Sequence, residues 1–133
     1  MFLNQLNESQ KTALLIIAEE FILADNILDA NEARKLKSLE SESGIKSADI
    51  SADSHYDINV LCARFDTENA KAAAMLEIMM IGYSDREFAV QESMFIRDMA
   101  KLFGFDREKL LNMMQWAKKK VELDNEAEQF FKR

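Results

Sequence analysis

The chain has 133 residues, a formal net charge of −7 and a sequence pI near 4.8. This length suits a single domain with one hydrophobic core. The acidic balance argues against a nucleic-acid-binding protein, which needs a basic face to replace phosphate counterions, and against binding to an anionic membrane surface. Proline is absent and only 3 glycines occur, which favours long helices over a turn-rich β fold. We therefore expect an all-α fold, a single helical bundle of about six to seven helices.

The first half of the chain predicts a buried helix followed by a surface helix. The first helix is expected to begin at an N-cap, Ser9, and to run to Ala24. Its second half is apolar on nearly every side, which indicates a central position in the bundle. The second helix is predicted over 30–43, where a narrow apolar stripe separates charged residues, and Gly44 ends it. Residues 46–54 are polar and predict a loop.

The second half predicts four further segments. A short third helix is expected over 55–65, and Asp66 or Thr67 caps a fourth, almost wholly apolar helix that ends near Tyr83. A fifth helix is predicted over 89–103, ending at Gly104. Asp106 caps a sixth helix through the lysines at 118–120, which suit the negative end of a helix dipole; the helix is expected either to end there or to continue into the tail.

The tail after these lysines is polar but contains four apolar residues. They are Val121, Leu123, Phe130 and Phe131. A disordered tail has no need of such side chains. We expect them to dock on the bundle or to contact another copy, which makes a homodimer through the C-terminal tail a second hypothesis.

An internal repeat relates the two halves. Asp25, Glu32 and Gly44 recur 60 residues later as Asp85, Glu92 and Gly104 (85−25, 92−32 and 104−44). The repeated unit is a buried helix, an acidic turn, a surface helix and a glycine stop. We assign residues 1–133 to a single domain with similar halves over about 9–45 and 69–105, followed by a C-terminal helix and tail over 106–133.

The acidic turn ADNILDANE resembles half of a calcium-binding loop. An EF-hand loop needs oxygen ligands at its first and third positions and a glutamate at its twelfth. With Glu32 as the twelfth residue, the first and third are Phe21 and Leu23, which have no ligand oxygen. This excludes an EF-hand. A capping box from Asp29 to Glu32 explains the spacing better, although Ala89 stands at the corresponding place in the second copy.

A metal site is the functional alternative to capping. The four repeated acids would repel one another if they converged, unless a divalent cation such as Ca²⁺ or Mg²⁺ held them together. The candidate metal ligands are Asp25, Glu32, Asp85 and Glu92. Both interpretations stay open, with capping favoured.

Other residue patterns give little support for an enzyme. His55 is the only histidine and lies seven residues from Cys62, too far along one helix for proton transfer. No cysteine or histidine cluster suits zinc, and 3 glycines do not build a phosphate-binding loop. We expect no catalytic residue and no cofactor; carboxylate chemistry without a recognisable motif is the third alternative. A lone cysteine in an apolar run, with no signal-peptide pattern or membrane-spanning run, predicts a buried, inert thiol and a cytoplasmic protein.

Methionines and phenylalanines recur at helical spacing in the second half. They are Met75, Met79, Met80, Met94, Met99, Met113 and Met114 with Phe95, Phe103 and Phe105. The pattern predicts a core between the fourth, fifth and sixth helices. The alternative is an adaptable groove for a partner helix or an apolar ligand, because flexible thioethers repack readily.

The repeated acidic turn, with the helices on either side of it, resembles the TerB-like domain family. This family is named for tellurite-resistance proteins and is also found attached to J-domain co-chaperones. The resemblance covers roughly residues 9–118 and rests on the turns 25–28 and 85–88 with Glu32 and Glu92. The family's glycine after the aspartate is replaced by Asn26 and Arg86. The resemblance implies a duplicated helical bundle linked to stress resistance. We expect a non-catalytic cytoplasmic interaction module with a protein partner; the alternative is a divalent-metal-binding protein.

Overall fold

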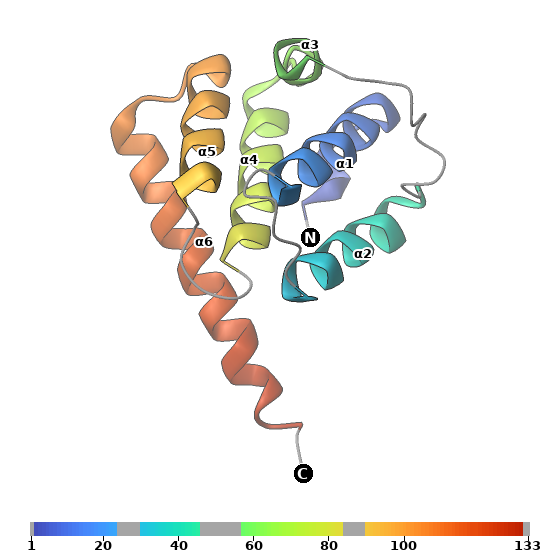
Figure 1. Ribbon diagram of the computed structural model, residues 1–133, viewed down its shortest axis with the longest axis vertical. Helices are drawn as coiled ribbons and strands as arrows, with labels where there is room; N and C mark the ends of the chain where they lie inside the picture. Colours follow the sequence, from blue (N-terminus) through green and yellow to red (C-terminus); the bar gives the residue numbers. More distant parts are fainter. Residues whose placement is uncertain (1, 24–29, 46–56, 84–89, 132–133) are drawn as a thin grey trace.

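The protein is an all-helical bundle, which confirms the predicted fold class (Figure 1). The computed structural model describes residues 2–23, 30–45, 57–83 and 90–131. Within these ranges one short 3-10 helix precedes six α-helices, and no strand is present. The elements are η1 (Leu3–Gln5), α1 (Glu8–Ile22), α2 (Ala30–Ser43), α3 (Ile58–Cys62), α4 (Glu68–Gly82), α5 (Val90–Phe103) and α6 (Arg107–Glu128).

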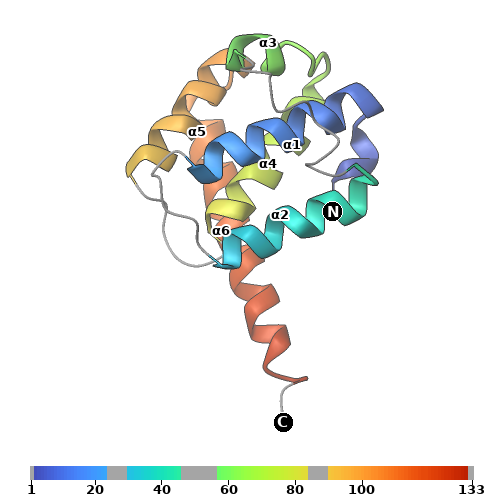
Figure 2. The same cartoon turned by 45° about the vertical axis from the view of Figure 1, so that its right-hand side comes forward.

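Helices α1 and α4 form the centre of the bundle, as their apolar composition predicts. They pack against each other, and the remaining helices cover them (Figures 1 and 2). Side chains on several sides of α1, including Leu14, Ile17 and Phe21, are inaccessible to solvent, and so are Met75 and Ile78 of α4. The apolar surface buried around these two helices drives the folding of the bundle.

The two halves use the same helices at the same spacing. The bounds of α1 and α4 differ by 60 residues at both ends (68−8 and 82−22), and so do those of α2 and α5 (90−30 and 103−43). Gly44 and Gly104 follow α2 and α5, each with φ +76°. Helix α1 packs against α2 and α5, and α4 packs against α5 and α2. The halves are therefore similar in helix length, helix ends and packing partners.

The caps of the two central helices differ from the prediction in one case. Asn7, and not Ser9, caps α1: its Oδ1 accepts from the Gln10 amide at 2.8 Å, and its own amide donates to Gln10 Oε1 at 3.0 Å. Of the two candidate caps, Asn7 has a glutamine three residues later to close the capping box, whereas Ser9 has Thr12 at that place. Thr67 caps α4 through Oγ1, which accepts from the Ala70 amide at 3.0 Å.

The third helix is shorter than predicted, and the sixth helix includes part of the tail. Asp57 caps α3, which is shorter than the predicted segment 55–65; His55 lies outside the described residues. Of the two alternatives for the sixth helix, the structure shows the longer one: α6 continues past the lysines to Glu128, and Lys120 forms an ion pair with Asp124 one turn later. Such a pair supports the continued helix.

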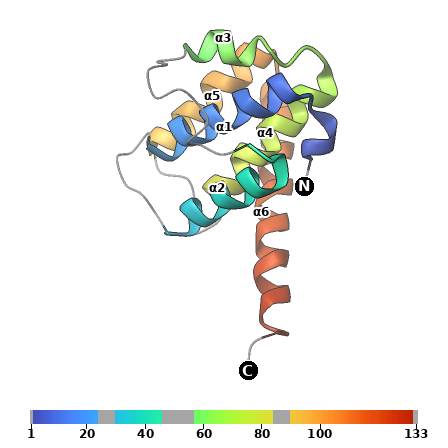
Figure 3. The same cartoon turned by 90° about the vertical axis from the view of Figure 1, so that its right-hand side faces the viewer.

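The apolar residues of the tail separate into two groups. Val121 is buried against the bundle, as the docking hypothesis expects. Leu123, Phe130 and Phe131 are exposed, because the last part of α6 projects beyond the other helices (Figures 1 and 3). Docking on the chain's own bundle therefore accounts for only one of the four.

The methionine pattern forms mostly core. Five of the seven methionines named above are buried: Met75, Met79, Met80, Met99 and Met113. Met114 is partly buried and Met94 is exposed. Phe103 packs edge-on against Phe65, with ring centroids 5.8 Å apart. The side chains left partly open, Met114 and Phe105, mark the edge of a groove described below.

Candidate functional site

The repeated glutamates occupy equivalent places in α2 and α5. Glu32 and Glu92 are the third residues of their helices, where a carboxylate interacts favourably with the helix dipole. They are only 5% and 3% exposed, although glutamate is normally a surface residue. Neither side chain is free of interactions. Their burial shows that both carboxylates belong to the packed structure and are not solvated surface charges.

The structure describes two of the four predicted metal ligands, Glu32 and Glu92. Asp25 and Asp85 lie outside the described residues, as do the predicted capping positions Asp29 and Ala89. In the described ranges, no three histidine, cysteine, aspartate or glutamate side chains gather closely enough to hold a metal ion. Helices α2 and α5 both pack against α1 and α4, so Glu32 and Glu92 lie on helices that share the same two neighbours.

The sequence did not predict that two polar residues, Glu77 and Gln10, would be buried and hydrogen-bonded inside the bundle. Glu77 in α4 is buried, and its Oε2 accepts from the Phe2 amide at 2.8 Å, which fixes the N-terminal segment on α4. Gln10 is also buried, and its Nε2 donates to the Arg64 carbonyl at 3.0 Å and to Asp66 Oδ1 at 3.1 Å. A glutamate inside an apolar helix was the available signal for Glu77, since a buried charge requires hydrogen-bond partners.

A groove of about 580 Å³ lies between α5 and α6. Its apolar side chains come from both helices and from the turn that joins them: Ile96, Ala100, Phe105, Leu110, Leu111 and Met114. Leu111 is 44% exposed, while Ile96 and Ala100 are buried and form the floor. Two residues of the methionine and phenylalanine pattern seen in the sequence, Phe105 and Met114, therefore line this groove.

The rim of this groove is basic although the whole chain is acidic. Arg97, Lys101 and Arg107 line it and are exposed. In the part of the chain that the structure describes, none of these three cations forms an ion pair. Among the lining residues that the structure describes, Asp106 supplies the one carboxylate, and it accepts a hydrogen bond from the Lys109 amide at 2.8 Å as the cap of α6. An apolar floor with a cationic rim suits an amphipathic, acidic ligand.

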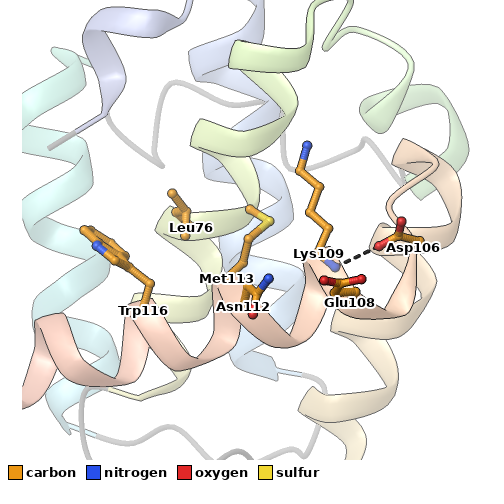
Figure 4. A pocket seen from close by; sticks show the side chains of 7 residues that line it. All are labelled: Leu76, Asp106, Glu108, Lys109, Asn112, Met113 and Trp116. Carbon is orange, nitrogen blue, oxygen red and sulfur yellow. Dashed lines mark hydrogen bonds between the residues drawn. The ribbon is translucent and has the colours of Figure 1, made fainter.

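A second hollow lies on the opposite flank of α6, next to α4 (Figure 4). Its volume is about 490 Å³, and Leu76, Met113 and Trp116 form its apolar end. Figure 4 shows the charged and polar side chains of Asp106, Glu108 and Lys109 towards the start of α6. The Trp116 ring is tilted against the Phe2 ring with centroids 5.6 Å apart, and 43% of the tryptophan is exposed.

The described residues give no support to nucleophilic catalysis at the cysteine. Cys62, the last residue of α3, is buried, and burial raises the pKa of its thiol from 9.0 to about 11. The thiolate is the reactive form, so a raised pKa makes the residue unreactive near neutral pH. This agrees with the predicted buried and inert thiol.

Comparisons with known proteins do not assign the chain to a family. No model of a protein family, no curated protein and no solved structure matches it. None of the described helices combines the length and apolar character needed to cross a bilayer. The resemblance to the TerB-like family thus rests on the repeated acidic turn alone.

Proposed function

We propose that this protein is a non-catalytic interaction module whose partner is an acidic, amphipathic helical segment bound between α5 and α6. The observation that carries the proposal is the groove itself, in which Arg97, Lys101 and Arg107 surround an apolar floor. Apolar anchors of a partner helix would fill the groove, and its carboxylates would meet the rim cations. Met114, whose flexible thioether repacks readily, is able to adjust to the partner.

The cellular setting is part of the same proposal. From the resemblance of the repeated acidic turn, we propose a TerB-like module that acts in the cytoplasm in tellurite or stress resistance. Its support is the equal spacing of acids and glycines in both halves and the equal helix lengths that follow from it. A growth assay of a deletion strain with tellurite, against the complemented strain, tests this part separately.

A charge-reversal experiment tests the groove. The triple variant R97E/K101E/R107E changes the charge by −6 at the rim (three positions, two units each). The matched control R34E/K35E/K37E makes the same change on α2, away from the groove. Partners captured by the wild-type protein and by the α2 variant should be lost from the rim variant. Equal capture by all three proteins would refute binding at this rim.

Peptide binding provides the direct measurement. The probe is a fluorescent helical peptide with leucines at positions i, i+3, i+4 and i+7 and glutamates elsewhere; the matched peptide has lysine in place of each glutamate. We expect fluorescence anisotropy to show binding of the acidic peptide only, weakening with added salt because the rim charges are exposed. Binding of the basic peptide with equal affinity would contradict the assignment.

A divalent-metal-binding protein is the second candidate. The observation in its favour is the burial of two repeated carboxylates, Glu32 and Glu92, which together with Asp25 and Asp85 would supply oxygen ligands. An ion that binds the folded state raises its melting temperature. Calcium and magnesium titration of chelator-treated protein should then raise the melting temperature of the wild type but not of E32Q/E92Q. An unchanged melting temperature at millimolar ion would reject this candidate.

A further inference from the structure

The projecting end of α6 is a helix with exposed apolar residues, beyond the last buried residue among those that the structure describes. After Val121, the last buried residue, seven residues from Glu122 to Glu128 continue the helix (128−121). They make about two turns, and all are exposed apart from the partly buried Asp124. Figures 1 and 3 show this part extending beyond the other helices. These two turns continue an already formed helix and need no nucleation of their own, but they leave apolar side chains in water, where burial against another surface would be favourable.

The apolar residues on this end recur every seven positions. Trp116 lies seven residues before Leu123, and Phe130 lies seven residues after it, in the turn that ends the helix. They are 43%, 60% and 86% exposed. Residues seven apart lie on one side of a helix, so Trp116 and Leu123 share one side of α6, and Phe130 follows in the turn directly beyond Glu128. We call these three residues the apolar seam. The seam begins at the hollow between α4 and α6, where Trp116 lies beside Leu76 and Met113 (Figure 4).

The charges around Leu123 determine which partner fits the seam. Lysines at 118–120 precede Leu123, and the acids Glu122, Asp124, Glu126 and Glu128 alternate around and after it. Two such helices in parallel would place lysines beside lysines and acids beside acids. In an antiparallel pair the lysines of one helix face the acids of the other, which is favourable in both places at once.

We propose that a second copy of this chain binds the seam, through antiparallel pairing of two α6 helices about Leu123. With Leu123 opposite Leu123 of the second copy, Trp116 lies level with Phe130 of that copy, because each is seven residues from the centre. The hollow beside Trp116 receives this phenylalanine. Lys119, four residues before the centre, lies beside Glu126 of the second copy, three residues after it. The arrangement is a closed two-fold dimer, and it uses the flank of α6 opposite to the α5–α6 groove.

The contact is small, since it covers one side of a short pair of helices. Interfaces that bury less than about 1,200 Å² belong mostly to weak and transient complexes. We therefore expect a monomer–dimer equilibrium that depends on protein concentration in the micromolar range. Each molecule in the dimer still has its α5–α6 groove open for a different partner.

Sedimentation velocity of the full chain tests the dimer. The wild-type protein should shift from monomer to dimer with concentration, and L123E should remain a monomer. The matched control is V60E, on α3, because Val60 is 57% exposed and Leu123 60%; this variant should dimerise like the wild type. A wild-type monomer at every concentration, a dimer of L123E, or loss of the dimer in V60E would each overturn the proposal.

Charge exchange tests the orientation. K119E and E126K should each weaken dimerisation by on the order of tenfold, and the double variant K119E/E126K should restore it because the pair is reversed. Lys119 and Glu126 are both exposed, so these variants keep the core intact, and circular dichroism verifies their helix content. Failure of the double variant to restore the dimer would refute antiparallel pairing.

Discussion

Gly104→Ala is expected to destabilise the protein through backbone conformation alone. Gly104 has φ +76°, and a Cβ built at this position meets no atom within 4 Å, so the substitution causes no steric clash. A left-handed backbone costs an L-residue about 1–2 kcal/mol. The reduced freedom of the unfolded alanine chain offsets about 0.4–1 kcal/mol of this. We therefore expect the free energy of unfolding to fall by about 1 kcal/mol.

Urea denaturation followed by circular dichroism measures this change. The slope of the free energy against urea should stay constant and the midpoint should fall, as for a change in stability without a change in exposed surface. The melting temperature should fall by about 3 °C. Gly104→Asn should lose less, because asparagine adopts the left-handed region more readily than alanine.

The repeat gives this prediction an internal check. Gly44 has the same φ and the same open surroundings, so Gly44→Ala should cost as much as Gly104→Ala. The two costs should add in the double variant, because the sites end different helices. Asn112→Ala, on the exposed face of α6, is the control and should stay within about 0.5 kcal/mol of the wild type. Unchanged or increased stability of Gly104→Ala would refute the reasoning.

Three further changes test other parts of the structure. Gln10→Ala removes half of the α1 capping box and two bonds to residues 64 and 66, so the free energy of unfolding should fall by about 1–3 kcal/mol in urea denaturation; Gln10→Glu, which keeps the acceptor but not the donor, should lose part of this. Met79→Ala empties a fully buried position and should cost about 2–5 kcal/mol, whereas Met79→Leu should cost under about 1.5 kcal/mol. Burial raises the pKa of Cys62 from 9.0 to about 11, so between these values the unfolded chain loses the thiol proton before the folded chain does. Stability should therefore decrease as the pH rises from 9.0 to about 11, and Cys62→Ala should lack this component of the pH profile.

The sequence by itself determined the helical architecture. The apolar composition of the segments ending near Ala24 and Tyr83 predicts two central helices, and α1 and α4 are central. The glycines at 44 and 104 predict helix ends, and both adopt positive φ there. These features depend on local chemistry, namely side-chain periodicity and the conformational freedom of glycine, so they can be read along the chain.

The tertiary structure alone decided which charges are buried and which apolar residues are exposed. Glu32 and Glu92 are buried, and Leu123 and Phe130 are exposed, against the usual preference of each residue type. Both results depend on where neighbouring helices pass and where they stop. The basic rim likewise exists only because α5 and α6 place Arg97 and Arg107, ten residues apart in the sequence, on one groove. A side chain's surroundings are set by packing between distant segments, which sequence periodicity does not specify.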